Sequence, residues 1–516
     1  MNQFCWQSRV TDRFKSMSNQ HKLNLKDLLS GIIDAPPIAF NDICDDSRLV
    51  NKGDVFFALK GIESHGCDFI DSVIDSNAAA IIYEPPYELA YSENRIPIIP
   101  VDNLRCLLGE IANRHYDYPS KSMNIVGITG TNGKTTVAWL IKSCLNNMGY
   151  TCGYVGTLGY GIESLKKISL TTPSCISLHK ILFNLSKSGA KYSAIEVSSH
   201  AIEQNRIAGI EFDSVIFTNL SRDHIDYHNS MEEYGAIKAR LFTKIKSKVK
   251  IINISDSFGK SLSNQIKEDV IASSIKNIES SNYEKFISLE EKKLEEFGYT
   301  IRINSSWGNK EIFLPFIGEF NIENSIQATA LLLSYNFSLN EVSDAIKKCN
   351  PPPGRMQLIQ LNKNYDLPKV IVDFSHTPSS LNLAINAIRD HFHNRKIWCV
   401  FGCGGNRDRG KRKLMGKIAE ENADYIVVTS DNPRNEDPDT IILNILEGIS
   451  TDVRTIKNRS EAIEYAVMSA DEKDIILIAG KGHENFQITK NKTIEFSDQD
   501  ISSEALKKKL DNIQND

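Results

Sequence analysis

The pattern of apolar and polar positions divides the chain into stretches of different type, and its last third is the most regular. Helical patterns separate five strand candidates, at 369–374, 396–402, 425–430, 453–456 and 474–479. Strands that alternate with helices in this way predict a doubly wound parallel sheet. One of the helical segments spans 460–470, and Ser460 could cap it.

Two other stretches carry strand patterns. Residues 280–316 alternate between apolar and polar with several charges, which predicts an antiparallel meander added to a sheet. An apolar run around Ile125 and Ile128 leads into the segment GITGTNGKTTV (127–137), and a helical apolar pattern follows it. That order predicts a strand, a glycine loop and a helix.

The glycine loop is the strongest functional signal in the chain. Gly130 and Gly133 would let backbone N–H groups close around an anion at the positive end of the helix. Lys134 adds a full charge there, and the Thr135 hydroxyl could reach a Mg²⁺ ion. We therefore expect ATP binding, the alternative being a plain glycine turn between two elements. The loop follows a shorter spacing than the usual P-loop because Ile128 stands where the first glycine would be.

Breaks in the pattern suggest three α/β domains. We predict an N-terminal domain over 1–104, a central nucleotide-binding domain over 105–351 and a C-terminal domain over 352–516. The stiff PPPG segment at 351–354 is the candidate linker before the last domain.

Composition narrows the class of protein. The 516 residues are 41 % apolar and 24 % charged, as in ordinary globular proteins. No apolar run is long enough to span a membrane, the N-terminus does not look like a secretory signal, and a net charge of −5 argues against a nucleic-acid partner. The ten cysteines include no C-x-x-C pair, which favours reduced thiols in the cytoplasm. We expect a monomer.

Polar residues cluster where predicted strands of the central block end. Glu196 could be a Mg²⁺ ligand beside the P-loop threonine or simply a capping glutamate. Two histidines and two aspartates, from Asp223 to His228, could suggest zinc. The triphosphate loop favours Mg²⁺ instead, because that ion prefers few protein ligands and several waters.

These strings together resemble the Mur ligase family over the whole chain. The matching segments are DSR (46–48), GTNGKTT (130–136), TTP (171–173), EVSSHAIEQNR (196–206), FTNLSRDHIDYH (217–228), YGAIKARLF (234–242), GEFNIENSIQA (318–328), PGRM (353–356), DFSHTP (373–378), GCGGNRDRGKR (402–412), DNPR (431–434) and GKGHE (480–484). The resemblance implies a central P-loop domain and a Rossmann-like C-terminal domain that binds an amino acid.

The resemblance also implies roles for ATP and metal. Two Mg²⁺ ions are implied, one held by Thr135 and Glu196 and the other by His224 and by Lys238, which such enzymes carry as a carbamate. Taken alone, Lys238 is a helix-surface lysine. His376 is a weak candidate for a catalytic base. The implied ATP-binding residues are Gly130, Thr131, Asn132, Gly133, Lys134, Thr135, Thr136, Asn324, Arg355 and Asp373.

Two further sets of residues are implied for the other substrates. For the UDP-linked substrate they are Ser47, Thr171, Thr172, Ser198, Gln204 and Arg206, and this substrate is expected between the first two domains. For the incoming amino acid they are Arg407, Asp431, Asn432, Pro433, Arg434, Gly480 and Glu484. Without the resemblance, Ser47 is a turn serine and Arg434 a surface arginine. Phe374, Ser375 and Asn406 depart from the family's usual Tyr, Ala and Asp.

The DNPR segment resembles the signature of family members that add meso-diaminopimelate rather than L-lysine. A guanidinium at Arg434 could grip the second carboxylate that lysine lacks, and Glu484 would receive the distal ammonium. The implied reaction is ATP-dependent amide formation on the D-glutamate of UDP-N-acetylmuramoyl-L-alanyl-D-glutamate through an acyl phosphate, in cytoplasmic peptidoglycan precursor synthesis. Two alternatives stay open: a lysine-adding or other Mur-type ligase, and a P-loop phosphotransferase or ATPase without ligation.

Overall fold

The chain forms two compact units. The computed structural model describes residues 23–61, 64–88, 96–223, 225–266, 268–278, 283–361, 366–490 and 492–515. One unit contains Met1–Ser122 together with two later segments, Pro173–Ser188 and His200–Glu211. The other unit contains Met123–Thr172, Gly189–Ser199 and Phe212–Asp516.

A parallel sheet in the order β1-β2-β3-β4 forms the core of the first unit. Its strand β2 is buried along its whole length, as expected for a continuous apolar run with both faces covered. Phe57 packs among α2, α4 and α6 on one face, whereas Phe56 packs against α3 on the other. The elements are β1 (Ile43–Cys44), β2 (Val55–Ala58), β3 (Ala80–Tyr83), β4 (Ile98–Pro100), α2 (Leu25–Leu28), α3 (Ile70–Asp75), α4 (Leu104–His115), α6 (Cys175–Lys187), and the 3-10 turns η1 (Ser47–Leu49), η2 (Gly66–Phe69) and η3 (Pro119–Ser122).

Two glycines let the later segments close onto α4. A Cβ on Gly109 would stand 2.4 Å from the carbonyl carbon of Ala208, and one on Gly209 would stand 2.6 Å from the Gly109 oxygen. Real Cβ atoms do not approach that closely, so side chains at these positions would push the segments apart. Asn113 then donates from Nδ2 to the Gly209 carbonyl over 2.8 Å.

The second unit contains two large sheets, of which the first has the order β14-β13-β12-β11-β10-β9-β5-β8-β6-β7. It is parallel from β12 to β6, and β12, β13 and β14 form the antiparallel meander predicted from the alternating pattern. Its strands are β5 (Asn124–Thr129), β6 (Cys152–Gly156), β7 (Gly159–Gly161), β8 (Tyr192–Glu196), β9 (Ser214–Phe217), β10 (Val249–Asn253), β11 (Val270–Ser274), β12 (Lys285–Glu295), β13 (Gly298–Ser305) and β14 (Lys310–Leu314). Its helices are α5 (Lys134–Asn147), α8 (Ile225–His228), α9 (Met231–Thr243), α10 (Ser257–Ile266), α11 (Phe320–Ser334) and α12 (Leu339–Lys347), while α7 (Ser199–Glu203) belongs to the first unit from His200 onward.

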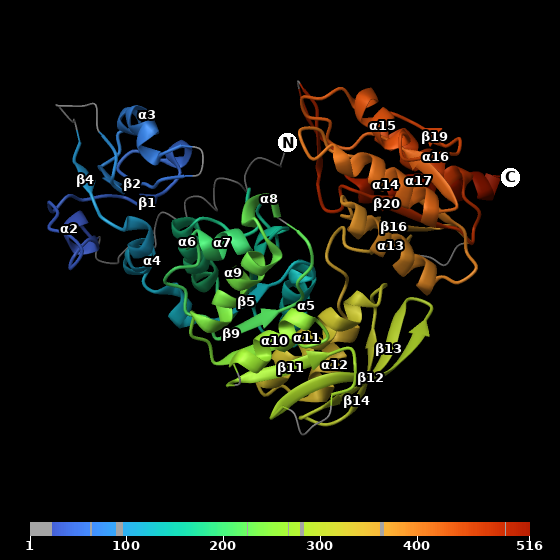
Figure 1. Cartoon of the computed structure of the whole chain (residues 1–516), viewed down its shortest axis with the longest axis horizontal. Helices are drawn as coiled ribbons and strands as arrows, with labels where there is room; N and C mark the ends of the chain where they lie inside the picture. The colour runs from blue at the N-terminus through green and yellow to red at the C-terminus, as the bar shows by residue number, and fades with distance from the viewer. Residues whose placement is uncertain are drawn as a thin grey trace, which may run out of the picture. The chain divides into compact units, whose positions relative to one another are not determined.

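The other large sheet has the order β15-β16-β20-β17-β18-β19, and all five predicted strands are present. Its strands β16, β19 and β20 are labelled in Figure 1. Successive residues of β17 point to opposite faces: Cys399 packs among α13, α14 and α15, and Val400 packs against α16 and α17. Helices on both faces confirm the doubly wound architecture. The elements are β15 (Gln357–Ile359), β16 (Lys369–Asp373), β17 (Ile397–Phe401), β18 (Tyr425–Val428), β19 (Arg454–Thr455), β20 (Ile475–Ala479), β21 (Phe486–Ile488), β22 (Thr493–Glu495), α13 (Pro378–His391), α14 (Gly410–Asn422), α15 (Pro438–Leu446), α16 (Arg459–Ser469) and α17 (Asp498–Asn515).

One local prediction was wrong. The cap of α16 is Asn458 and not Ser460, because the helix begins at Arg459, two residues before the start that a cap at Ser460 would give. The Asn458 side chain accepts a hydrogen bond from the Ser460 backbone N–H over 3.0 Å. Across the described ranges, no helix combines the length and apolar character needed to cross a membrane.

Candidate active site

The glycine loop joins β5 to α5 as the sequence predicts. Gly130 and Gly133 have φ of 146° and 85°, values that favour glycine. A Cβ on Gly130 would lie 1.9 Å from Thr218 Oγ1, and one on Gly133 would lie 2.4 Å from Asn324 Oδ1. The close approach of β9 and α11 therefore requires glycine at both positions. This packing leaves the first N–H groups of α5 at the end of a buried strand, where an anion can bind.

Neighbouring side chains hold the shape of this loop. Thr218 donates from Oγ1 to the Asn132 carbonyl over 2.6 Å, and Asn219 Oδ1 accepts from the Asn132 N–H over 3.0 Å. Lys134 lies across the loop, donating to the carbonyls of Gly130 and Thr131 over 2.9 Å each. The pKa of Lys134 lies below its ordinary value, because the effect of burial exceeds the opposing effect of the Glu196 and Asp223 charges.

A pair of oxygen ligands lies beside the loop. Thr135 donates from Oγ1 to Glu196 Oε2 over 3.0 Å, and both side chains are buried. Glu196, at the end of β8, also accepts from the Tyr154 hydroxyl and from the Thr157 N–H and hydroxyl. A Cβ on Gly156 would stand 2.3 Å from Glu196 Oε1. The hydroxyl and carboxylate oxygens are hard donors held close together, so this pair fits a Mg²⁺ ion that keeps several waters.

Lys238 is buried and not on a helix surface. Only 1 % of its area is exposed, its Nζ donates to the Gly130 carbonyl over 2.9 Å, and it stands 4.3 Å from the Tyr234 ring centre. Burial lowers its pKa well below the ordinary value, the Lys134 charge lowers it further, and Asp223 opposes both. Two lysine ammonium groups therefore meet at a single carbonyl oxygen.

Of the two histidines in the 217–228 segment, His228 is the one whose surroundings the structure describes. His224, the predicted ligand of a second metal, lies outside the described residues, and so does the side chain of Asp226. His228 is fully buried, with Nε2 2.8 Å from Ser199 Oγ, and its ring contacts Tyr234. These contacts place His228 in the packing of α8 against α9.

Asn324 lies close to the glycine loop. It is buried in α11, its Nδ2 donates to Asn321 Oδ1 over 3.1 Å, and its Oδ1 is the atom that a Cβ on Gly133 would meet. Thr131, Thr135 and Thr136 are buried in the same region, whereas Asn132 is exposed.

Arg355 follows the proline segment. Its guanidinium lies 4.7 Å from the centre of the Phe374 ring, and its Nε is buried without a partner among the described residues. Asp373 ends β16 and accepts hydrogen bonds from the N–H groups of Met356 and Ser375 over 2.7 and 2.9 Å. Two departures from the family pattern thus have structural roles, because Phe374 supports the guanidinium and Ser375 bonds to Asp373.

The predicted amino-acid-binding residues lie in loops after the adjacent strands β20, β17 and β18. Arg434 has a φ of 51°, and its Nη1 donates to the Gly405 carbonyl over 2.9 Å. A Cβ on Gly404 would stand 2.8 Å from that Nη1, and one on Gly405 would stand 1.9 Å from the Pro433 oxygen. The two glycines therefore make room for the half-buried arginine, while Arg407 is exposed.

The loops after β18 and β20 are joined by polar side chains. Asn432 donates from Nδ2 to Glu484 Oε2 over 2.7 Å, and both Asn432 and Asp431 are buried. A Cβ on Gly480 would stand 2.9 Å from Asp431 Oδ2. Asn406, the third residue that departs from the family pattern, accepts a hydrogen bond at its Oδ1 from the Asn435 N–H over 3.1 Å. It thereby connects the loop after β17 to the loop after β18.

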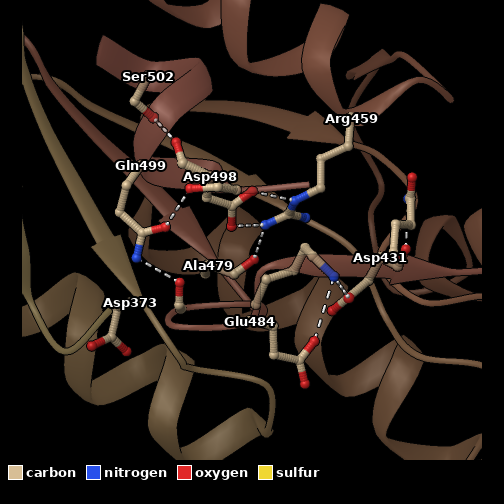
Figure 2. A network of polar contacts seen from close by, with 12 residues as sticks. Asp373, Asp431, Arg459, Ala479, Glu484, Asp498, Gln499 and Ser502 are labelled. Carbon is tan, nitrogen blue, oxygen red and sulfur yellow. Dashed lines mark hydrogen bonds and ion pairs between the residues drawn. The ribbon is translucent and has the colours of Figure 1, made fainter. Parts of the chain in front are cut away.

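Two charged groups under these loops were not predicted from the sequence. Lys481 is fully buried, as is the pair of Arg459 and Asp498, whose two hydrogen bonds measure 2.8 and 2.7 Å (Figure 2). Burial acts to lower the pKa of Arg459, but Asp498 raises it. Lys481 belongs to the GKGHE segment (480–484), but the sequence around it contains no pattern that predicts its burial. Arg459 looks like an ordinary residue at a helix start.

The residues predicted for the UDP-linked substrate divide between the two units. In the second unit, Thr172 donates from Oγ1 to the Glu196 carbonyl over 2.7 Å and accepts the Ser198 N–H over 3.1 Å, while Thr171 lies 3.3 Å from Thr157. In the first unit, Arg206 donates to Gln204 Oε1 over 3.0 and 2.6 Å, and Ser47 begins η1.

Family models match most of the chain. They are the Mur ligase family catalytic domain over residues 41–116, the Mur ligase middle domain over 128–332 and the Mur ligase glutamate ligase domain over 354–482. Together they include the glycine loop, Lys238 and the DNPR loop.

Related proteins agree with these matches. The UDP-N-acetylmuramoyl-L-alanyl-D-glutamate–2,6-diaminopimelate ligase of Coxiella burnetii is 40 % identical over 466 residues, 89 % of this chain and 94 % of that protein. The enzyme of the same name from Pseudomonas putida is 39 % identical, with the same shares covered. A solved ligase of that name is 31 % identical, with a TM-score of 0.67 over 95 % of this chain and 99 % of its own. At 18 % identity and a TM-score of 0.59, the folylpolyglutamate synthase of Mycobacterium tuberculosis shares the fold over 73 % of this chain and 93 % of its own.

Proposed function

The chain belongs to the Mur ligase family, and on that premise we propose that it adds meso-diaminopimelate to UDP-N-acetylmuramoyl-L-alanyl-D-glutamate. The reaction is an ATP-dependent amide ligation of peptidoglycan precursor synthesis. ATP phosphorylates the γ-carboxylate of the D-glutamate, and an amine of diaminopimelate attacks the acyl phosphate. A tetrahedral intermediate then collapses to the tripeptide product and phosphate, with ADP already formed.

The glycine loop and its surroundings are the proposed ATP site. Residues 130–136 offer backbone N–H groups to the phosphates, and Lys134 adds charge. Thr135 and Glu196 are the proposed holders of one Mg²⁺, which supplies charge neutralisation and alignment of the phosphates when bound. Asn324 is proposed near the adenine, and Arg355 is proposed to stabilise charge on the transferring phosphoryl group, supported by its unpartnered Nε. Asp373 orders the backbone behind Arg355.

Lys238 is proposed to act as an N-carboxylysine. Its lowered pKa favours the neutral amine, which is the form that attacks CO₂ and then loses a proton to give a carbamate. The product replaces a second positive charge beside Lys134 by an anionic oxygen ligand. Together with His224, this carbamate is the proposed holder of the second Mg²⁺.

The remaining roles are proposed from the family match. The UDP-linked substrate is proposed to contact Ser47, Thr171, Thr172, Ser198, Gln204 and Arg206. His376 is a candidate base for the attacking amine, and its Nδ1 lies 2.8 Å from the Phe374 carbonyl. The cytoplasm is the proposed compartment, since each cysteine that the structure describes and classifies is a free thiol.

The loop that contains Arg434 is proposed to select meso-diaminopimelate over L-lysine. Its guanidinium is held by the Gly405 carbonyl in a space that two glycines keep open, 3.5 Å from the carbonyl of Asn432, whose side chain bonds to Glu484. A bidentate bond to the distal carboxylate of diaminopimelate would contribute about 1.5–3 kcal/mol, or roughly 10- to 150-fold over lysine. L-lysine remains the alternative substrate, because it keeps the ammonium that Glu484 would bind.

A direct comparison of the two amino acids tests the assignment. Phosphate release is measured with purified UDP-dipeptide, ATP and either meso-diaminopimelate or L-lysine. We expect diaminopimelate to be preferred, and Arg434→Ala to lose most of that preference. The control is Arg454→Ala, an exposed arginine of the same sheet, which should change nothing. Equal or faster turnover of lysine by the unaltered protein would refute the specificity.

A further inference from the structure

Lys481 is a fully buried charged residue at the centre of the amino-acid-binding loops. It follows β20, and none of its side chain is exposed. Its Nζ lies 3.1 Å from Asn432 Oδ1, 3.4 Å from Glu484 Oε2 and 3.6 Å from Asp431 Oδ1. A single ammonium thus connects the loop after β18 to the loop after β20. In Figure 2, Asp431 and Glu484 lie close together below the Arg459–Asp498 pair.

The contacts of Lys481 fix the orientation of Glu484. One oxygen, Oε2, accepts from both Asn432 Nδ2 over 2.7 Å and Lys481 Nζ. Two donors on one oxygen therefore restrain the carboxylate, and we take the other oxygen, Oε1, as the acceptor for the substrate ammonium. Asn432 is held in turn, because its Oδ1 accepts from Lys481 Nζ and from the Ile488 N–H over 2.9 Å.

Lys481 also balances the charge of the site. Asp431 and Glu484 contribute two negative charges, and Lys481 and Arg434 contribute two positive ones. The next charged group inward, Arg459, is neutralised by its own partner, Asp498. These four charges of the loops therefore sum to zero while they are held apart from one another. Such a site suits an amino-acid head that carries both an ammonium and a carboxylate, and it disfavours a side chain that brings a lone ammonium.

We propose that Lys481 is a positioning and specificity residue for the incoming amino acid. It orients Glu484 and Asn432, and its charge disfavours L-lysine relative to a substrate with a zwitterionic distal head. The proposal rests on the proposed function. It adds a residue that acts through Glu484 and Asn432 and does not itself touch the substrate.

The test compares Lys481→Met and Lys481→Gln with the unaltered protein. Steady-state kinetics are measured with varied diaminopimelate and, separately, varied L-lysine. For Lys481→Met we expect KM for diaminopimelate to rise on the order of tenfold, with kcat changed much less. The ratio of kcat/KM for diaminopimelate over lysine should fall by a similar factor, because a lone ammonium no longer meets a like charge.

The glutamine variant separates charge from hydrogen bonding. It keeps a donor near Asn432 without the charge, so it should shift the lysine ratio like the methionine variant, but with a smaller rise in KM. It also keeps the test usable if Lys481→Met does not fold. The matched control is Lys509→Met, which removes a partly buried lysine of α17 that bonds the carbonyls of Met468 and Ala470. That control should leave both amino-acid constants unchanged.

The outcomes distinguish a failure of the Lys481 proposal from a failure of the proposed function. If KM for ATP and for the UDP-dipeptide rises in parallel with KM for diaminopimelate, or if the amino-acid ratio stays constant, Lys481 only supports folding and the proposal is overturned. If the unaltered protein does not use diaminopimelate, or prefers lysine, it is the proposed function that fails. That result is read before any variant is made.

Discussion

At the scale of single residues, the chemistry proposed for the glycine loop depends on two lysines that share one acceptor. Lys134 and Lys238 both donate to the Gly130 carbonyl over 2.9 Å. Two ammonium ions so close repel each other, and burial penalises each charge further. The less exposed of them, Lys238, is therefore the better candidate for a neutral amine. The same argument explains why a lysine, and not an arginine, suits the position, because arginine does not lose its proton.

We predict that Lys238→Ala lowers turnover on the order of a hundredfold, because the second Mg²⁺ proposed beside the phosphates would lose an anionic oxygen ligand. Short carboxylic acids such as formate or acetate should restore part of the activity by supplying the missing oxygens. Lys244→Ala, at an exposed position at the end of the same helix, serves as the control and should leave turnover unchanged. Native mass spectrometry of the unaltered protein in bicarbonate should show a CO₂ adduct that the Lys238→Ala variant lacks. Full activity of that variant would contradict the carbamate role.

At the scale of elements, a buried ion pair connects two helices to the sheet whose loops are proposed to bind the amino acid. Arg459 begins α16, and Asp498 begins α17. The guanidinium also donates to the Ala479 carbonyl over 3.0 Å, at the end of β20. The residue after Asp498, Gln499, donates from Nε2 to the Gly482 carbonyl over 2.8 Å (Figure 2). The loop with Lys481 and Glu484 is thus held from behind by both helix starts.

We predict that Asp498→Asn destabilises the protein by about 3–5 kcal/mol, because it leaves a buried guanidinium without its charged partner. Replacing both partners by apolar residues, Arg459→Met with Asp498→Leu, should recover much of that loss. The control joins the same two helices: Glu464→Gln breaks an exposed pair with Lys508 and should cost less than about 1 kcal/mol. Denaturant unfolding measures all three variants. Equal effects of Asp498→Asn and Glu464→Gln would show that the buried pair has no special weight.

The elements that the sequence predicted well are those whose pattern is local. The five strands predicted for the last sheet agree within one or two residues. For four of them the reason is that parallel strands covered on both faces need continuous apolar runs. The fifth, β19, is a short exposed strand at the edge of the sheet. The glycine loop was predicted for a similar reason, since glycine and lysine at a strand-to-helix junction have few other uses. Lys481 and Arg459 were not predicted to be buried, because charged residues are buried only when distant segments supply their partners. Here the partners lie 49 and 39 residues away.

At the scale of the whole molecule, chain order and spatial grouping differ. Segments Pro173–Ser188 and His200–Glu211 join the first unit although they follow the glycine loop in sequence. The hydrogen bond from Asn113 to Gly209 joins residues 96 positions apart, and no local sequence pattern predicts such a contact. The predicted boundaries at 104 and 351 remain predictions. The segment between these two, Gly189–Ser199, belongs to the second unit and includes Glu196 at the end of β8.

The parts of the proposed reaction also come from distant segments, and this predicts how ATP is used. The phosphate loop, Lys238, Arg355 and the amino-acid loops belong to separate elements, so no one element holds a complete site. ATP should therefore be consumed only when a carboxylate is present to take the phosphoryl group and an amine to resolve the acyl phosphate. We expect phosphate release with ATP alone, or with either substrate missing, to lie on the order of a hundredfold below the complete mixture. A coupled phosphate assay over the four mixtures measures this directly. Sustained release with ATP alone would instead support the remaining alternative, a P-loop ATPase that performs no ligation.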